Sequence, residues 1–315
     1  MSAYRKELFF GCGDRRIEQE EGITNMKEHK KTGLVLEGGG MRGIYTAGVL
    51  DVFMDHSVHF DGVIGVSAGA IHGSSFVAGQ KGRSIRYYKK YCKDKRFMSF
   101  WSLLRTGDIV GEQFCYHDLP ERLDPFDYQA FRKADTEFYV TCSNVENGKA
   151  EYLRIRDMKM EMDLLRASAS MPYVSKVVTV GSKKLLDGGC TDSIPVAAFQ
   201  KMGFPHSVVV LTRHDGYVKK AENKKMAGFF YRKYPAFVKA IANRHLVYNQ
   251  TLEQIRRMEQ EGKIFVIRPS VELTIQRTGH DPYELEKTYQ IGRMDAEKKI
   301  GAMLEWLAQY GDCES

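Results

Sequence analysis

The stretch VIGVSAG, residues 63–69, decides the fold. An apolar run leads directly into a G-x-S-x-G sequence, and a segment with helical character follows over 68–78. This order is typical of a nucleophile elbow, a sharp strand-to-helix turn that exposes a serine hydroxyl. We therefore predict Ser67 as a nucleophile, with Gly65 and Gly69 leaving room for the strained backbone of the turn.

A second glycine-rich turn, GGGMRG at 38–43, follows the apolar run 34–36. Backbone N–H groups at the start of a helix suit a developing negative charge, so we predict an oxyanion hole here. The side chain of Arg42 either adds a positive charge to the site or anchors the loop through an ion pair. The candidate residues of the oxyanion hole are Gly38, Gly39, Gly40, Met41, Arg42 and Gly43.

The same glycines also fit a dinucleotide-binding fingerprint, G-x-G-x-x-G between a strand and a helix. That alternative requires an acidic residue about 20 residues further on, at the end of the second strand, to hold a ribose. Ser67 stands at that strand end, and Asp61 precedes the strand. We therefore favour the oxyanion hole.

Strand-like and helix-like segments alternate along the chain, which predicts an α/β fold with a mainly parallel central sheet. Hairpins are predicted around Asn147-Gly148 and Gly181-Ser182. We expect a polar N-terminal extension (1–30), a catalytic domain (31–215), and a helical C-terminal region with one added strand (216–315) packed on the same domain. Predicted strands cover 33–37, 61–66, 137–141, 151–155, 177–180, 185–186, 207–212 and 263–267, and predicted helices cover 42–56, 68–78, 160–169, 237–261 and 283–310, with a mixed helical cover over 84–131.

A nucleophilic serine needs a proton acceptor, and Asp187 is the favoured candidate. It ends an apolar run and precedes Gly188-Gly189, where the backbone can bend and approach another loop closely. A carboxylate can act as the base if it lies within hydrogen-bond reach of the serine. The alternative is a simple turn-forming Asp-Gly. Histidine is the usual partner of a catalytic serine, but none of the four that follow in the second half, His206, His214, His245 and His280, lies in a glycine-marked turn.

Together these three turns resemble the patatin-like phospholipase family, in which a G-G-G-x-[RK]-G loop, a G-x-S-x-G elbow and a D-G-G or D-G-A turn occur in this order. The stretches ASASMP at 167–172 and DSIP at 192–195 also resemble the family, and the resemblance spans roughly 33–212. It implies a three-layer α/β/α fold and a lipid acyl hydrolase of bacterial type. It further implies a Ser67–Asp187 dyad that uses no histidine, metal or cofactor.

Two other functions stay open at this point. One is an α/β-hydrolase-type esterase with a histidine triad, although Glu37 stands where a histidine usually opens that oxyanion motif. The other is a catalytically silent lipid-binding protein, against which the presence of both candidate catalytic residues argues.

Composition and cysteine usage predict a cytoplasmic protein. Residues 1–31 contain no apolar core of a secretory signal, and no run reaches the roughly 20 apolar residues of a membrane-spanning helix. The six cysteines are dispersed without metal-ligand spacing, which favours reduced thiols. They are Cys12, Cys92, Cys115, Cys142, Cys190 and Cys313, and Cys190 is expected to fill space rather than react.

The formal net charge of +7 is concentrated in one stretch, residues 217–245, which holds eight basic residues and one acid. Aromatic residues alternate with these charges, so we expect peripheral contact with an anionic membrane or a lid over the acyl site. A solvated helical face is the alternative. Nucleic-acid binding is not expected because no recognised module accompanies the charge. The basic residues are Lys219, Lys220, Lys224, Lys225, Arg232, Lys233, Lys239 and Arg244.

Overall fold

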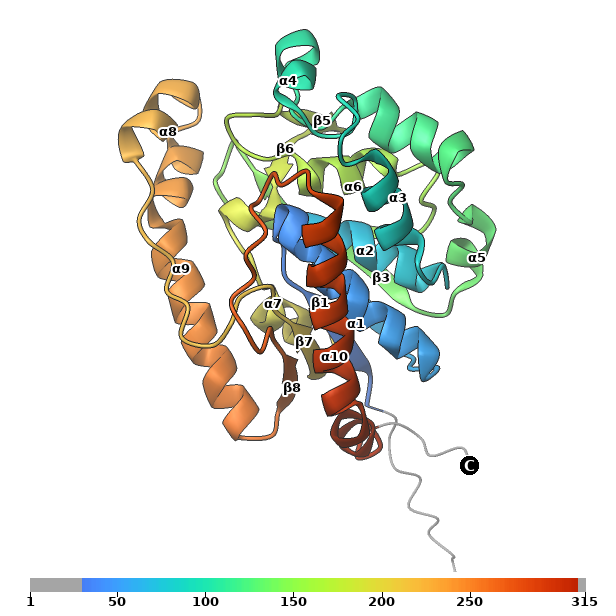
Figure 1. Ribbon diagram of the computed structural model, residues 1–315. Helices are drawn as coiled ribbons and strands as arrows, with labels where there is room; N and C mark the ends of the chain where they lie inside the picture. Colours follow the sequence, from blue (N-terminus) through green and yellow to red (C-terminus); the bar gives the residue numbers. More distant parts are fainter. Residues whose placement is uncertain (1–29, 311–315) are drawn as a thin grey trace, which may run out of the picture.

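A computed structural model describes residues 30–310 and contains one eight-stranded, mostly parallel sheet (Figure 1). The strand order is β5-β6-β3-β2-β1-β7-β8, and β4 pairs with β3. Strands β3, β2, β1, β7 and β8 are parallel. The two predicted hairpins are formed by β3 with β4 and by β5 with β6, and β6 is antiparallel to β3. The α/β prediction is confirmed. The strands are β1 (Thr32–Leu36), β2 (Gly62–Val66), β3 (Glu137–Asn144), β4 (Ala150–Ile155), β5 (Val178–Val180), β6 (Lys183–Asp187), β7 (His206–Val210) and β8 (Ile264–Ile267).

The helices follow the predicted segments with two differences. The helix expected from residue 42 begins at Ile44, because residues 40–43 form a short 3-10 turn (η1, Gly40–Gly43). The basic stretch contains an unpredicted short helix, α8 (Lys224–Phe230). The other helices are α1 (Ile44–Asp55), α2 (Ala68–Val77), α3 (Arg83–Tyr91), α4 (Phe100–Thr106), α5 (Tyr128–Lys133), α6 (Met162–Ala169), α7 (Val196–Lys201), α9 (Pro235–Gln260) and α10 (Pro282–Leu307), with a π-helical segment η2 (Phe114–Leu123) and a 3-10 turn η3 (Gly188–Cys190).

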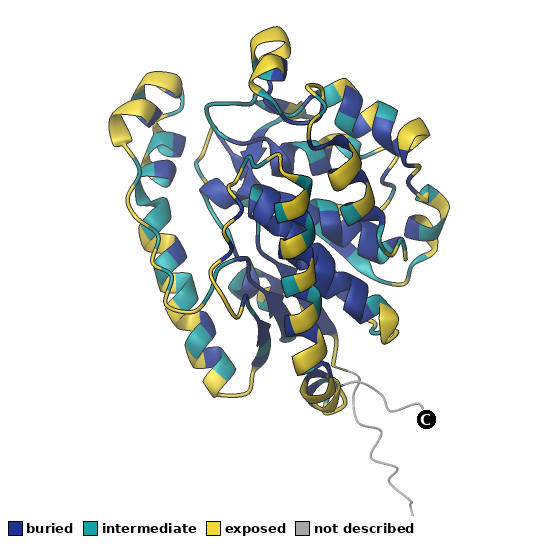
Figure 2. Ribbon diagram, viewed as in Figure 1, coloured by how far each residue is buried: buried dark blue, intermediate teal, exposed yellow. Residues whose placement is uncertain are grey.

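The sheet is buried on both faces, which gives the three-layer α/β/α architecture (Figure 2). Side chains alternate along a strand, so Leu34 and Leu36 of β1 join the core that includes residues of α1, α2 and α10. Val35 points the other way, into a second core with residues of α7 and α9. A parallel sheet covered in this way needs continuous apolar strands, and β1 and β2 are buried along their whole length.

The C-terminal part of the chain shares the sheet and the core with the part before it. Strand β8 pairs with β7, and α10 packs along α1. Helix α1 is consequently buried over ten successive residues, since the sheet covers one side and α10 the other. The crossing is close, because a Cβ added at Gly48 would lie 2.2 Å from the Tyr289 carbonyl oxygen and one at Gly292 would lie 2.1 Å from the Tyr45 carbonyl oxygen.

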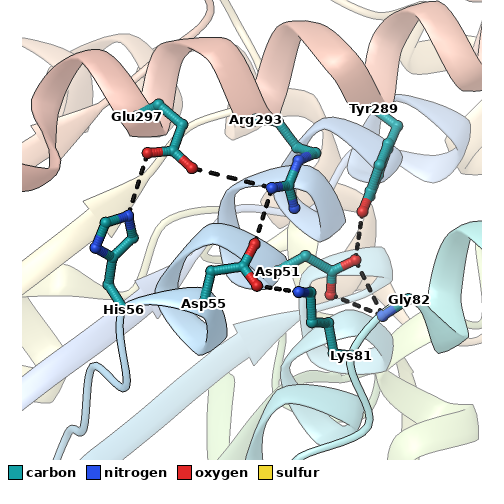
Figure 3. A network of polar contacts seen from close by, with 8 residues as sticks. All are labelled: Asp51, Asp55, His56, Lys81, Gly82, Tyr289, Arg293 and Glu297. Atoms are coloured by element: carbon teal, nitrogen blue, oxygen red, sulfur yellow. Dashed lines mark hydrogen bonds and ion pairs between the residues drawn. The ribbon is translucent and has the colours of Figure 1, made fainter.

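A polar network fixes α10 over α1 and the turn before α3 (Figure 3). Asp51 accepts hydrogen bonds from the Tyr289 hydroxyl at 2.5 Å and from the Gly82 N–H. Asp55 pairs with Arg293 at 2.8 Å and with Lys81. These contacts join three elements that are distant in the sequence, and they orient the helix that follows the loop of residues 268–281.

The close α1–α10 crossing predicts a position-specific effect of alanine in α10. Gly292→Ala places a methyl group against backbone that cannot yield easily, so we expect a loss of about 1–3 kcal/mol in the free energy of unfolding. Gly301→Ala is the matched control, because it lies in the same helix with open space around it and should stabilise by roughly 0.5–1 kcal/mol. Denaturant unfolding of both variants measures the difference. Equal effects at the two positions would contradict the packing described.

Candidate active site

Ser67 stands at the junction between β2 and α2 in the strand–turn–helix context that its motif predicts. Its backbone has φ 54° and ψ −123°, a region that residues other than glycine rarely adopt. This conformation costs of order 1–3 kcal/mol. Gly65 is part of β2, and Gly69 packs so closely on β1 that an added Cβ would lie 2.6 Å from the Leu36 carbonyl oxygen. The surrounding structure therefore maintains a strained serine, as expected of a nucleophile elbow.

Strand β3 brings Asp187 beside this serine. Strand β2 ends at Val66, which pairs with Thr141, and β6 ends at Asp187, which pairs with Cys142. Strand β4 pairs with the other edge of β3 at Cys142, so β6 must pair with the same edge as β2, beyond the point where β2 ends. Strand β2 is parallel to β3 and β6 is antiparallel to it, so their carboxyl ends face one another. Ser67 directly follows one of these ends, and Asp187 is the other.

The turn after Asp187 is shaped by the same crowding. A Cβ on Gly188 would lie 2.2 Å from the Thr141 carbonyl oxygen, so only glycine fits at this point. The Asp187 carboxylate accepts a hydrogen bond through Oδ1 from the Gly189 N–H at 2.7 Å. Its Oδ2 atom and the Ser67 hydroxyl make no hydrogen bond within residues 30–310. Both residues line one pocket, and such hydrogen bonds often tighten only when substrate is bound.

Two serines that carried no predicted role connect these elements. The Ser168 hydroxyl donates to the Thr141 carbonyl at 2.7 Å and accepts from the Ser67 N–H at 3.0 Å. The Ser143 hydroxyl donates to the Asp187 carbonyl at 2.8 Å. Ser168 belongs to the family-like stretch 167–172, which was the available sequence signal. The motif marks Ser168 as unusual, but only the fold shows that it lies between Ser67 and Thr141.

The glycine-rich loop contributes four of its six predicted residues to the pocket: Gly38, Gly39, Gly40 and Arg42. Met41 does not supply a free donor, because its N–H donates to the Arg277 carbonyl at 3.0 Å. The Arg42 N–H is also engaged, with the Gly39 carbonyl at 3.3 Å. Gly43 packs against Ala68 and is not part of the pocket lining. The N–H groups of residues 38–40 are thus the ones left for a developing oxyanion in the described structure.

Ser67 separates two chemically different pockets. One is an apolar cavity on the side of α2, α3 and α6. A cavity with this lining suits an apolar chain. Gly40, Ser67 and Met171 line both pockets, so the two adjoin at Ser67. Apolar residues of the larger cavity include Phe97, Met98, Val110, Leu119, Met158 and Leu165.

The second pocket contains Asp187 and is strongly cationic. Of its basic residues, Arg42 was expected in the oxyanion loop, whereas Lys219 and Arg244 belong to the basic stretch that was expected at a membrane surface or in a lid. The side chain of Arg244 is in fact only 12% exposed, and it pairs with Glu222 at 2.9 Å. Burial, followed by repulsion from Arg213, lowers the pKa of Arg42 to about 10. The five basic residues that line this pocket are Arg42, Arg213, Lys219, Arg244 and Arg277.

None of the four candidate histidines lines either pocket. His206 stacks on Tyr310 at 3.6 Å between ring centroids, and His280 contacts the Cys92 carbonyl. His214 contacts the Asp215 carbonyl, and His245 lies in α9. Their positions argue against a histidine triad around Ser67.

Other groups with possible chemistry lie outside the site or are inert. Burial raises the pKa of the Cys190 thiol to about 12, so this residue fills space as expected. Cys12 and Cys313, like the N-terminal extension up to residue 29, lie outside the described residues. No three or more His, Cys, Asp or Glu side chains of residues 30–310 form a metal-binding group. Nor is any helix in this part of the chain long and apolar enough to cross a membrane.

The α/β/α sandwich and the strained serine between β2 and α2 are features that serine hydrolases with a nucleophile elbow share. A family model described as patatin-like phospholipase matches residues 34–199, more than half of the chain, and the protein belongs to this family. A second model, a domain of unknown function (DUF6363), matches residues 234–308.

This chain matches only part of the length of each relative. The uncharacterized protein YjjU of Escherichia coli K12 is 31% identical over 187 residues, which are 57% of this chain and 51% of YjjU. The lysophospholipase NTE1 of Debaryomyces hansenii is 26% identical over 203 residues, 60% of this chain and 12% of that protein. The crystal structure of VipD from Legionella pneumophila aligns with a TM-score of 0.45 and 12% identity over 87% of this chain and 67% of VipD.

The Ser168 bridge predicts a defect that extends to the nucleophile. Ser168→Ala removes the partner of two buried groups, the Ser67 N–H and the Thr141 carbonyl, so we expect a loss of about 1–3 kcal/mol of stability and slower labelling of Ser67 by a fluorophosphonate. Ser170→Ala is the control, because its hydroxyl bonds only to the Arg166 carbonyl within the same segment. Equal labelling rates in the two variants would show that Ser168 does not position the elbow.

Proposed function

We propose that this protein is a serine acyl hydrolase that cleaves fatty acyl ester bonds of phospholipids or related lipids through a Ser67–Asp187 dyad. One observation carries the proposal: a strained, buried serine lies where an apolar cavity meets a polar pocket that contains a carboxylate. In an ester of an apolar acid and a polar alcohol, the carbonyl carbon likewise joins an apolar part to a polar part.

The proposed reaction passes through an acyl-enzyme on Ser67, with Asp187 as the proton carrier. Ser67 Oγ attacks the ester carbonyl carbon while Asp187 accepts the hydroxyl proton. Negative charge develops on the carbonyl oxygen, which the N–H groups of residues 38–40 are placed to stabilise. Asp187 then returns the proton to the leaving alcohol, whose C–O bond breaks to leave an acyl-enzyme. Water activated by Asp187 hydrolyses this intermediate and restores both residues.

Lysophospholipid is the substrate class that the named relatives favour. NTE1 proteins are lysophospholipases, and two of them match 60% of this chain. One apolar cavity adjoins Ser67, which suits a lipid with one acyl chain. The chain spans about half the length of YjjU and about an eighth of the NTE1 proteins, so the proposal extends to the acyl hydrolase reaction alone.

Two substitutions test the dyad. Ser67→Ala should abolish hydrolysis of p-nitrophenyl esters and fluorophosphonate labelling. Asp187→Asn retains an oxygen for the Gly189 N–H but loses the base, and should lower kcat by about 10²–10⁴-fold. Asp192→Asn is a matched control, because this acid lies outside both pockets and accepts from Tyr152 at 2.8 Å. Activity retained in Ser67→Ala or Asp187→Asn would refute the dyad.

We also propose that helix α8 contacts the surface of an anionic membrane. Phe229 is 75% exposed and Phe230 54% exposed, and both lie in a segment flanked by exposed Lys224, Lys225, Arg232 and Lys233. The helix adjoins the pocket, since Phe230 packs on Tyr173, which follows the pocket residue Pro172. Exposed aromatic and basic side chains together suit the headgroup region of a bilayer.

Charge reversal tests this surface. Mutation of Lys224, Lys225, Arg232 and Lys233 to Glu should weaken binding to phosphatidylglycerol-containing vesicles, since each basic residue contributes roughly 1 kcal/mol near such a surface. Vesicle co-sedimentation measures the change. The control reverses four exposed charges elsewhere, which alters net charge equally: Lys201, Arg257, Lys287 and Lys298. An equal loss in both variants, or no loss in the first, would refute α8 as the contact.

A further inference from the structure

We propose that the cationic pocket beside Ser67 binds a phosphate group on the alcohol side of the ester, so that the preferred substrate is an acyl ester with an anionic rather than a neutral or zwitterionic head group. This inference rests on the proposed acyl hydrolase function and specifies its substrate. The side chains that carry it come mainly from the region after residue 212.

The pocket holds more positive charge than its own acids neutralise. Five basic residues line it, together with the acids Glu37 and Asp187. Within residues 30–310, Arg244 is the one of the five that forms an ion pair, with Glu222. Arg213 instead lies over the Tyr217 ring and Lys219 over the Tyr248 ring, at 4.2 and 4.3 Å from the centroids. These contacts orient the cations without neutralising them.

Two buried guanidinium groups each have an Nε atom without a hydrogen-bond partner among the described residues. Arg42 is 8% exposed, and its side chain forms no hydrogen bond or ion pair with the described residues. Its Nε atom and the Nε atom of Arg244 are both buried without a hydrogen-bond partner. A buried charged donor without an acceptor costs free energy, and a phosphate offers several charged acceptor oxygens that match the planar guanidinium.

Glu37 does not supply the missing acceptor. Its carboxylate accepts from the Thr212 N–H and from the Tyr248 hydroxyl, each at 2.6 Å. Both oxygens are therefore engaged in fixing the end of β1 to the residues after β7 and to α9. This arrangement keeps the acid near the pocket while leaving Arg42 available.

The protonation of Lys219 supports an anionic ligand. Burial, followed by repulsion from Arg244 and Arg277, lowers the pKa of Lys219 to about 7, although Glu37 and Glu222 act in the opposite direction. A bound anion would favour the protonated amine and would relieve the repulsion among the cations. The pocket thus gains stability when an anion enters it.

The position of the pocket identifies which part of a substrate it meets. When the acyl chain occupies the apolar cavity and the carbonyl lies at Ser67, the alcohol portion is directed toward the second pocket, because Ser67 and Gly40 line both. The basic residues therefore surround the leaving group. A phosphate attached to this alcohol would therefore lie among the basic residues and would complement their positive charge.

Paired substrates test the inference. Acylglycerol phosphate, acylglycerophosphocholine and acylglycerol with the same acyl chain are compared in neutral detergent micelles, which remove any contribution of an anionic bilayer. We expect kcat/KM to be about 10–100-fold higher for acylglycerol phosphate than for acylglycerol, the range that charged hydrogen bonds provide. Arg213→Gln and Arg277→Gln should each lower this ratio about 10-fold. Arg257→Gln, exposed on the same helix as Arg244 but outside the pocket, should leave it unchanged.

Binding to the Ser67→Ala protein separates this inference from the proposed reaction. Calorimetry should give tighter binding of acylglycerol phosphate than of acylglycerol, and much weaker binding of inorganic phosphate. Hydrolysis of all three esters with a ratio near one would overturn the phosphate inference and leave the hydrolase function intact. Tight phosphate-dependent lipid binding without hydrolysis by the wild type would overturn the hydrolase function alone. Inorganic phosphate bound as tightly as the lipid would identify a free-phosphate site and overturn the substrate assignment.

Discussion

The site depends on the pairing of two strands with one edge of β3. Thr141 is the last partner of β2, and the next residue, Cys142, is the partner of Asp187 at the end of β6. Hydrogen bonding of the β3 backbone therefore places Val66, the residue before the candidate nucleophile, and Asp187, the candidate base, opposite successive residues of β3. Ser168 joins the same backbone to the Ser67 N–H. A rigid sheet, rather than a flexible loop, consequently aligns the two residues.

The sequence allowed the elbow, the aspartate turn and the fold class to be predicted because each depends on local chemistry. Gly65 and Gly189 relieve contacts within their own turns, with Ala70 and Asp187, so this part of the pattern is readable without the tertiary structure. Gly69 and Gly188 relieve contacts with β1 and β3, which only the fold shows. Met41 shows the limit of this reasoning. Its N–H was predicted to face the substrate, but Arg277, more than two hundred residues later, supplies a carbonyl acceptor for it.

The cationic pocket could not be predicted for a similar reason. Its basic residues come from the glycine-rich loop, the segment after β7, helix α9 and the loop before α10, and no spacing in the sequence relates them. The excess of basic residues over 217–245 was expected to lie together, at a membrane surface or in a lid. Six of these eight basic residues are exposed, whereas Lys219 and Arg244 line the pocket beside Ser67. Composition reports the total charge of a segment, but burial decides where that charge acts.

The region after residue 215 is therefore part of the site. Arg277 holds the glycine-rich loop through its carbonyl, and its side chain lies against Gly40, where an added Cβ would be 2.7 Å from Arg277 Cγ. Its loop is anchored in turn, because α10 packs on α1 through Gly48 and Gly292 and is fixed there by Asp51 and Asp55. Helix α1 directly follows the glycine-rich loop. Arg277 and α1 thus meet at the glycine-rich loop, so the packing of the C-terminal helix and the geometry of this loop are set together.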